Sequence, residues 1–479
     1  MTSRPRLTVL GTGYLGITHA ACMAHLGFEV LGVDTDREKV IQLSGGEPPV
    51  FEPQLGRRLR DGLASGRLAF TTSYEHAAAF GDVHFICVGT PQRRDGDGAD
   101  LSQVDACVAA LAPLLTRPCL VVGKSTVPSG TAAAIAAEIA RRAPAGRSAE
   151  LCWNPEFLRE GHAVDDTLTP DRIVVGVTSP RGEAIMREVY AAQIAAGVPL
   201  HVTDLATAEL AKVAANAFLA TKISFINAMA EVCDAAGADV TVLGRVLGAD
   251  PRIGSAFLNS GLGFGGGCLP KDIRAFTARA TELGAGGAVA LLREVDAINL
   301  RRRARVAELT CDLIGGSPAG EPVCVLGAAF KPGSDDVRDS PALDVARILH
   351  GMGARVTVYD PVAMDNARLA CPQLRYAASA REAATGAHVV LVLTEWPEFR
   401  DIDPAELGEV AAPQRAVIDA RHALDRRRWQ AAGWRYRAPG VPAPDRYGDS
   451  RSMIQPSPSW QPSPSWQPSS SWQPSSSWR

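Results

Sequence analysis

Short apolar runs recur along the chain, separated by longer segments in which apolar and polar residues follow a helical spacing. The first run, residues 7–10, is followed by a helix-like segment at 17–26 and a second apolar run at 29–33. Runs of the same kind return later, at 82–88, 119–122, 322–326, 356–359, 388–394 and 416–419. Strands that alternate with helices in this way are typical of parallel sheets. The pattern predicts an α/β protein with two Rossmann-like, doubly wound domains.

Residues 204–237 break this alternation. No proline or glycine occurs before Gly237, and helix formers dominate, which predicts one helix of roughly thirty residues, well above the usual length. Lys212 and Asn216 are four residues apart and share a face of that helix. Because Ala215 and Leu219 lie close by, the polar pair either faces a packed environment or is simply solvated. The length favours a helix that joins two domains and helps to form a dimer interface.

The C-terminal tail is different in kind. Residues 455–478 consist of four hexads, Gln-Pro-Ser-Pro-Ser-Trp twice and Gln-Pro-Ser-Ser-Ser-Trp twice. Proline and serine at this density cannot form a packed core, so we expect disorder over 441–479. The evenly spaced tryptophans either bind a groove on an unknown partner or are a repeat without function; they are Trp460, Trp466, Trp472 and Trp478.

Composition narrows the function classes. The net charge of −3, without a basic run, argues against a nucleic-acid partner. The ten cysteines are scattered without a CxxC pair, a reduced pattern that predicts neither a disulfide framework nor a metal site. The N-terminus lacks the apolar core of a signal peptide, and we expect no apolar run long enough to span a membrane. A cytoplasmic protein is therefore expected.

The first apolar run leads into a glycine pattern that predicts a dinucleotide site. Residues 11–16 read Gly-Thr-Gly-Tyr-Leu-Gly, a helix-like segment follows, and the second run ends at Asp34. The glycines let a pyrophosphate approach a helix N-terminus, and the acid binds the ribose hydroxyl. Asp34 would repel a 2′-phosphate, which favours NAD over NADP; the alternative is a strand-end turn residue. Thr90 and Thr126 follow later strands and either face the ligand or cap helices, with Thr131 as another possible cap.

A second glycine-rich stretch, residues 261–272, places Cys268 at the start of a predicted helix. A thiol ahead of a first helical turn, with Lys271 nearby, is expected to favour the thiolate, the form that attacks carbonyls. Asp272 lies four residues later and would share the face of the cysteine. The alternative is a glycine-rich loop that ends in a buried structural cysteine.

Four other charged residues are candidates for ligand contacts. Glu156 and Glu160 stand four residues apart behind a proline turn, either at a cofactor–substrate junction or as a charge pair at a helix start. Lys331 and Arg338 follow a strand of the C-terminal third and can hold phosphate or carboxylate, although a mixed-charge loop is usually surface.

Five separated motifs, taken in order, resemble those of the UDP-glucose/GDP-mannose dehydrogenase family. They are GTGYLG at 11–16, GKSTVPSGT at 123–131, NPEFLREG at 154–161, AELAKVAANAFLA at 208–220 and GFGGGCLPKD at 263–272, with AFKPGSDDVRDSPAL at 329–343 beyond them. The resemblance covers about residues 6–440. It implies oxidation of the C6 hydroxyl of a nucleotide sugar to a carboxylate, with two NAD and no metal.

The resemblance also implies roles for single residues. Cys268 would attack the intermediate aldehyde to give a thiohemiacetal, and a second hydride transfer would leave a thioester that water hydrolyses. The supporting catalytic groups would be an oxyanion-stabilising pair (Lys212, Asn216), a pair that orients the hydrolytic water (Asp272, Thr126) and a base (Glu156).

Binding residues are implied in the same way. The NAD site would be lined by Gly11, Gly13, Leu15, Gly16, Asp34, Lys39, Thr90, Thr126, Glu160 and Arg338. The nucleotide sugar would be held by Glu156, Phe157, Leu158, Lys212, Asn216, Arg252, Phe257, Asn259, Gly261, Gly265 and Lys331. The implied organisation is an NAD-binding domain at 1–200, a central helical dimerisation region at 201–300 that carries the catalytic lysine, asparagine and cysteine, and a UDP-sugar-binding domain at 301–440.

The exact sugar is less constrained by the motifs. Residues 252–261 look more like the UDP-glucose branch, with UDP-glucuronate as product, whereas the sequence CLPKD also occurs in the GDP-mannose branch. Leu15, Gly267, Leu269 and Asn259 depart from the commonest family pattern without removing a catalytic group. The same chemistry on GDP-mannose or a UDP-N-acetylhexosamine is the nearest alternative. A single-step β-hydroxyacid-type dehydrogenase, or an interaction module that acts through the tail, are two further alternatives.

Overall fold

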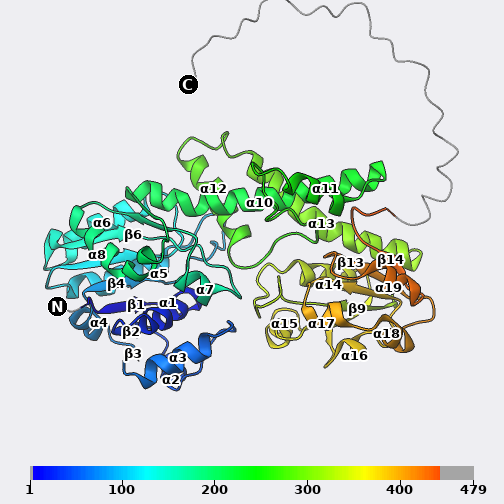
Figure 1. Cartoon of the computed structure of the whole chain (residues 1–479), viewed down its shortest axis with the longest axis horizontal. Helices are drawn as coiled ribbons and strands as arrows, with labels where there is room; N and C mark the ends of the chain where they lie inside the picture. Colours follow the sequence, from blue (N-terminus) through cyan, green and yellow to red (C-terminus); the bar gives the residue numbers. More distant parts are fainter. Residues whose placement is uncertain (1–3, 443–479) are drawn as a thin grey trace, which may run out of the picture. The chain divides into compact units, whose positions relative to one another are not determined.

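The computed structural model describes residues 4–442, in which two parallel sheets are joined by long helices (Figure 1). The central strands of both sheets are apolar and their side chains are almost completely buried, as expected for parallel sheets covered on both faces. The predicted tail, 441–479, lies outside the described residues from 443 onward. The α/β class predicted from the sequence is confirmed.

The N-terminal sheet has eight strands in the order β3-β2-β1-β4-β5-β6-β7-β8. All pairs are parallel except the single bridge between β6 and β7, which joins Trp153 to Gly176. The strands are β1 Leu7–Leu10, β2 Val30–Val33, β3 Leu68–Thr71, β4 Val83–Ile86, β5 Cys119–Gly123, β6 Ala149–Trp153, β7 Ile173–Gly176 and β8 Leu200–Thr203. Its helices are α1 Tyr14–His25, α2 Arg37–Ser44, α3 Leu55–Ala64, α4 Tyr74–Phe80, α5 Ser102–Leu111, α6 Thr131–Arg142, α7 Ala163–Leu168, α8 Pro180–Val189 and α9 Ala191–Ala195.

The C-terminal sheet has six parallel strands in the order β11-β10-β9-β12-β13-β14. They are β9 Pro322–Leu326, β10 Arg355–Tyr359, β11 Arg375–Tyr376, β12 Val389–Val392, β13 Ala416–Asp419 and β14 Arg435–Arg437. The accompanying helices are α14 Pro341–Gly351, α15 Met364–Ala370, α16 Ala380–Ala383, α17 Pro397–Asp401, α18 Pro404–Val410 and α19 Arg426–Ala431. Both sheets reverse strand order beside their first strand, at β1/β4 and at β9/β12, and ligands bind such sheets at this point.

Helix α10, Leu205–Ala236, is the long helix predicted from the sequence. Asp204 caps it by accepting a bond from the Thr207 amide, and Gly237 ends it at φ 72°, a conformation that glycine adopts without strain. It packs against α11 Val240–Gly248, α12 Leu269–Glu282 and α13 Leu291–Ile314 (Figure 1). Because α13 runs across residue 300, the boundary predicted there falls inside a helix.

Two details differ from the expectations. Helix α1 begins at Tyr14 rather than near residue 17, directly after the glycine turn. Gly130 rather than Thr131 is the N-cap of α6, because φ 96° at this position suits glycine, and the Thr131 hydroxyl donates back to the Pro128 carbonyl instead.

Within the described residues α10 is also long and apolar enough to cross a membrane, with a mean hydropathy of 1.3 in its most apolar window. The expectation that no segment would reach this length and hydropathy was therefore wrong. Core helices of globular proteins pass the same test, and 44% of this window is buried inside the protein. Buried polar side chains on α10, including Lys212 and Asn216, fit a core helix.

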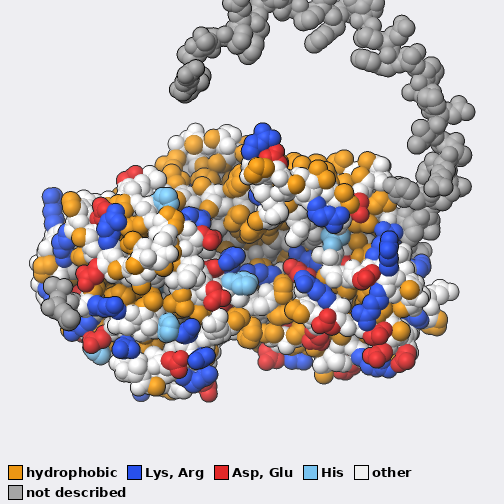
Figure 2. All heavy atoms as spheres, viewed as in Figure 1, with side chains coloured by type: hydrophobic (Ala, Val, Ile, Leu, Met, Phe, Trp, Pro, Cys, Tyr) orange, Lys and Arg blue, Asp and Glu red, His pale blue; other side chains and the backbone are white. Residues whose placement is uncertain are grey.

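One face of α10 stays uncovered in the single chain. Phe218, Phe225 and Val232 follow one another at seven-residue spacing, and 67%, 48% and 55% of their surfaces are exposed. Figure 2 shows hydrophobic side chains gathered at the top of the view, where Figure 1 places α10 and its neighbours. Exposed rows of large apolar side chains are typical of protein interaction surfaces.

Candidate active site

The turn between β1 and α1 leaves room for a dinucleotide. Gly11 has φ 87°, and a Cβ on Gly16 would overlap the Gly11 carbonyl, so both positions require glycine. Nothing lies within 4 Å of a Cβ placed on Gly13, the N-cap of α1. A cavity of about 580 Å³ opens here and is lined by Gly11, Gly13, Asp34 and Lys39, among others. Open space beside a helix N-terminus fits a pyrophosphate.

Asp34 closes one side of this cavity. Its Oδ2 accepts bonds from the Thr12 amide at 3.0 Å, the Thr12 hydroxyl at 2.8 Å and the Lys39 ammonium at 3.0 Å. Burial by itself would raise the pKa of Asp34, but these bonds and one from the Asp36 amide outweigh it and lower the pKa. An ionised carboxylate at the end of β2 suits a ribose hydroxyl.

Three other residues predicted for the NAD site lie around this turn. Leu15 packs against the buried core beneath the sheet. Thr90 is buried, and its hydroxyl donates to the Thr126 carbonyl at 2.7 Å, which ties the segments that follow β4 and β5. Thr126 itself lines a largely apolar cavity of about 320 Å³ together with Asp272.

Cys268 is the N-cap of α12, as predicted, with Pro270 in the first turn. It is the one exposed cysteine of the ten, all of which lie in the described part of the chain. Although the side chain is open to solvent, surrounding protein atoms bury it enough to raise its pKa to about 12, and the Glu156 charge adds to this whereas Lys212 opposes it. The expected ground-state thiolate was therefore wrong. Lys271, expected to assist, instead pairs with Asp272 at 2.6 Å.

Lys212 and Glu156 form a buried ion pair beside Cys268. The Lys212 ammonium lies 3.0 Å from Glu156 Oε1, and the two side chains are 5% and 12% exposed. Burial by itself would lower the pKa of Lys212, but the charges of Glu156 and other neighbours outweigh it and raise the pKa. A cation is thus held next to the thiol, where negative charge would be stabilised most strongly. The Phe157 ring lies 5.6 Å from the same ammonium.

Asn216 and Asp272 form a second buried pair. The Asn216 amide donates to Asp272 Oδ2 at 2.7 Å, and the Asp272 amide donates to the Cys268 carbonyl at 2.9 Å. Asp272 is 1% exposed and Asn216 is 7% exposed. Of the two interpretations of the Lys212–Asn216 pair, the packed environment is therefore the one observed.

The glycines before Cys268 allow the loop to pack closely against the C-terminal domain. A Cβ on Gly265 would overlap the Asp339 carbonyl, one on Gly266 would lie 2.8 Å from the Phe330 ring, and one on Gly267 would overlap the Arg338 guanidinium. Gly261 donates its amide to Asn227 Oδ1 at 2.8 Å. The loop is thus held between the central helices and the segment that follows β9.

Glu160 reaches the C-terminal domain rather than its neighbour Glu156. It accepts a bond from Ser334 Oγ at 3.0 Å and lies 3.5 Å from the Arg338 guanidinium, which is held mainly by Asp336. The pKa of the Lys331 ammonium is lowered, chiefly by burial, and Glu160 opposes that shift. The stretch that carries Glu156 and Glu160 contains no helix up to residue 162, so the helix-start interpretation was wrong.

Some predicted substrate residues are not brought to this group. Arg252 is exposed and pairs with Asp250 at 2.6 Å, and Phe257 is also exposed, at φ 64°. Asn259 lines a separate cavity of about 800 Å³ beside the end of β13.

Comparisons with known proteins place the whole arrangement in one family. The models of the UDP-glucose/GDP-mannose dehydrogenase family match residues 5–194 (NAD binding domain), 206–301 (central domain) and 324–426 (UDP binding domain). The chain belongs to this family. It is therefore an NAD-dependent nucleotide-sugar dehydrogenase, and the turn described above lies within its NAD-binding domain.

Individual relatives agree with the family assignment. The dehydrogenase is 41% identical over 439 residues to UDP-glucose 6-dehydrogenase of Rhizobium meliloti, a match that covers 91% of this chain and 100% of the relative. It is 40% identical to the enzyme of the same name from Pseudomonas aeruginosa, covering 91% and 98%. The structure of a UDP-glucose dehydrogenase from Pyrobaculum islandicum superposes with a TM-score of 0.85 at 37% identity, covering 92% and 98%.

The structure adds Arg421 to the residues around the dehydrogenase's glycine loop. Its guanidinium donates to the carbonyls of Gly263 at 3.2 Å, Phe330 at 3.3 Å and Leu393 at 2.8 Å. These three segments lie more than 60 residues apart from one another in the chain. The only sequence signal was its position two residues after the acid that ends β13, and nothing in the local pattern connected it to the cysteine loop.

Glu160 gives the dehydrogenase a pH-dependent contact between domains. Burial, followed by the charge of Asp336, raises the pKa of Glu160 from 4.5 to about 7. Between about pH 4.5 and pH 7, Glu160 keeps its proton in the folded protein but has lost it in the unfolded chain. The free energy of unfolding should therefore fall as the pH rises through this range. Glu160→Gln should flatten this slope, measured as urea midpoints at several pH values. Equal slopes in both proteins would contradict the assignment.

Proposed function

We propose that the enzyme oxidises the C6 hydroxyl of UDP-glucose to the carboxylate of UDP-glucuronate through a covalent intermediate on Cys268. The observation that carries this proposal is the position of Cys268, exposed at the start of α12 beside two buried polar pairs, Lys212–Glu156 and Asn216–Asp272. A single oxidation of an alcohol has no need of a nucleophile at this position.

The reaction needs two oxidations and one hydrolysis. NAD, when bound, accepts a hydride from C6 in each oxidation. In the first step the hydroxyl proton leaves and an aldehyde forms, and the Cys268 thiol then adds to it, losing its proton as the C–S bond forms. Loss of the hydroxyl proton and of a second hydride from this thiohemiacetal gives a thioester. Water then cleaves the C–S bond, which releases the carboxylate and regenerates the thiol.

The residues around Cys268 support these steps. The Lys212 ammonium and the Asn216 amide stabilise negative charge on the oxygen at C6. Since the pKa of Cys268 is raised, its proton must leave as the thiol attacks, and Lys212 favours that loss because its charge opposes the rise. Asp272 with Thr126 orients the hydrolytic water, and Glu156 accepts its proton.

UDP-glucose is the proposed substrate because the curated relatives that cover almost the whole chain are named for it. Lys331, Gly261 and Gly265 are proposed to line the sugar-nucleotide site with Phe157 and Leu158. We also propose that the enzyme acts in the cytoplasm.

The stoichiometry of NADH tests this function. UDP-glucose supplied in limiting amount should yield two NADH per sugar, counted from NADH absorbance and confirmed by detection of UDP-glucuronate. One NADH per sugar would contradict the four-electron reaction. Parallel assays with GDP-mannose and UDP-N-acetylhexosamines should be much slower, and a reversed preference would assign the alternative substrate.

We propose a homodimer through the exposed row on α10. Introducing glutamate at Phe218 and Phe225 should convert the dimer to a monomer, because two charges cannot be buried in an apolar contact. Sedimentation equilibrium measures the change, with an exposed residue far from α10, Leu369, replaced by glutamate as control. A monomeric wild type would overturn the proposal.

Removing residues 443–479 tests the tail separately: unchanged kinetics with a lost partner would favour the interaction module.

A further inference from the structure

The loop at residues 154–161 contains two glutamates, Glu156 and Glu160, whose side chains contact different parts of the protein. It begins where β6 ends and stops before α7, and it contains neither helix nor strand. Glu156 pairs with Lys212 at 3.0 Å, whereas Glu160 contacts Ser334 at 3.0 Å in the C-terminal domain. An irregular segment holds side chains in fixed positions only when other groups support its backbone.

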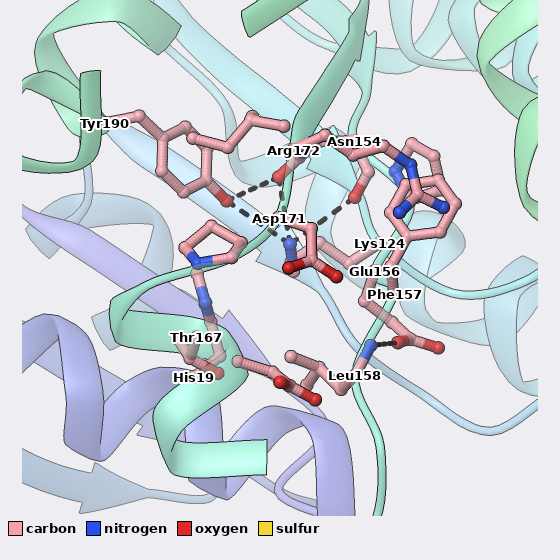
Figure 3. Close-up of a pocket in the computed structure, with 14 residues that line it drawn as sticks. His19, Lys124, Asn154, Glu156, Phe157, Leu158, Thr167, Asp171, Arg172 and Tyr190 are labelled. Carbon is pink, nitrogen blue, oxygen red and sulfur yellow. Dashed lines mark hydrogen bonds between the residues drawn. The ribbon is translucent and has the colours of Figure 1, made fainter. Parts of the chain in front are cut away.

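A buried lysine holds the first end of the loop. Lys124 follows β5 directly, and its ammonium donates to Asn154 Oδ1 at 2.9 Å. The Tyr190 hydroxyl donates to the same oxygen at 2.6 Å (Figure 3). The Asn154 amide donates to the Val174 carbonyl at 2.8 Å. All of the polar groups of the Asn154 side chain are therefore bound, and its orientation is fixed.

Lys124 has no ordinary ion-pair partner. It is 6% exposed, and no carboxylate of the described residues lies within 4.0 Å of its ammonium, which instead contacts the Asn154 side chain and the Tyr190 hydroxyl. A buried cation is costly unless its contacts are good. The Lys124 charge is therefore stabilised by contacts with Asn154, the residue that precedes the Pro155–Glu156 turn, and with Tyr190.

The turn after Asn154 is supported again around Glu156. Glu156 Oε2 accepts the Leu158 amide at 2.5 Å, while Oε1 faces Lys212. The Arg172 guanidinium stacks over the Phe157 ring, 3.9 Å from the ring centroid (Figure 3). A shift at Asn154 would therefore move the Glu156 carboxylate relative to Lys212.

A buried carboxyl group holds the second end. Glu52 is 6% exposed, and it accepts the Gly161 amide at 2.7 Å and the Ala163 amide at 2.8 Å. The Tyr14 hydroxyl also donates to Glu52, and Tyr14 is the first residue of α1, next to the NAD turn. At φ 79°, Gly161 lies against Gly333, so the same point touches the C-terminal domain.

We propose that Lys124 and Glu52 are positioning residues that hold the two ends of this loop, Lys124 setting Glu156 against Lys212 and Glu52 setting Glu160 against the C-terminal domain. The inference rests on the proposed function, in which Glu156 serves hydrolysis, and on the family resemblance, which implies that Glu160 lines the NAD site. It predicts that the two residues affect different steps, whereas ordinary structural contacts would affect all steps together.

Lys124→Met tests the first end. We expect kcat to fall about tenfold or more while KM for NAD changes less than about twofold, since the defect lies in hydrolysis. A burst of two NADH per active site should precede slow turnover, and intact mass after acid quenching should show the sugar acyl adduct on Cys268. Tyr190→Phe, which removes one bond to Asn154, should show the same adduct to a smaller extent and serves if Lys124→Met does not fold.

Glu52→Gln tests the second end. We expect KM for NAD to rise about fivefold or more with kcat nearly retained and no accumulated adduct, and Tyr14→Phe to shift KM in the same direction. Arg159→Ala is the matched control, because Arg159 is an exposed residue of the same loop that binds Asp166. It should leave both parameters unchanged.

The outcomes separate this inference from the proposed function. A wild-type enzyme that does not form two NADH per UDP-glucose overturns the function itself. If the wild type forms two, but Lys124→Met and Glu52→Gln change neither parameter, or lower kcat and raise KM together without an adduct, the positioning roles are wrong.

Discussion

Cys268→Ala should lower the rate of UDP-glucuronate formation at least about a thousandfold, because the aldehyde then has no thiol to attack. None of the other cysteines can replace it: eight are buried, and Cys311, which is partly exposed, lies on α13. UDP-glucuronate is quantified by chromatography and NADH by absorbance. The first oxidation does not use the sulfur, so slow reduction of one NAD per sugar is the residual activity we expect.

Two further variants sharpen this result. Cys311→Ala removes a free thiol away from the site and should leave both rates unchanged. Cys268→Ser keeps a hydroxyl nucleophile, so a covalent ester should form and then hydrolyse more slowly than the thioester. Full activity in Cys268→Ala would support the single-step dehydrogenase instead.

Local patterns were sufficient to predict the α/β class, the long helix α10, eight of the fourteen strands in the described residues and the glycine turn after β1. The ends of α10 depend on Asp204 and Gly237, whose capping roles are set by neighbours within one turn. The glycines at 11–16 and the acid at 34 belong to one strand–helix–strand unit, so their spacing determines their geometry. The pairing of Lys212 with Glu156 could not be predicted in this way, because β6 and α10 bring these residues together from 56 positions apart.

Charges on distant segments explain the main error at the active site. A cysteine at a helix start with an adjacent lysine predicts a thiolate, and both local features are present at Cys268. In the structure Lys271 forms an ion pair with Asp272, and the Glu156 charge lies near the Cys268 sulfur. Burial and the Glu156 charge raise the pKa of Cys268 instead of lowering it. Neither effect can be predicted from the residues of the glycine-rich motif itself.

Lys212→Met should lower kcat about a hundredfold to a thousandfold, the usual effect of removing a group that stabilises a developing oxyanion. Methionine keeps the apolar length of the side chain but leaves Glu156 without its cation and removes the charge that opposes the raised pKa of Cys268. Both oxidations should slow, which distinguishes Lys212 from Cys268. Single-turnover NADH formation measures each step, with Lys222→Met on the same helix as control.

Loss of the Lys212 charge should also destabilise the fold, and this can be separated from catalysis. An unpaired buried carboxylate costs roughly 3 kcal/mol, so the free energy of unfolding should fall by about that amount in Lys212→Met. Adding Glu156→Gln removes the unpaired charge and should restore most of the stability. Because the double variant still lacks the cation, its kcat should stay as low as in Lys212→Met; recovery of kcat together with stability would show that Lys212 acts only by supporting the structure.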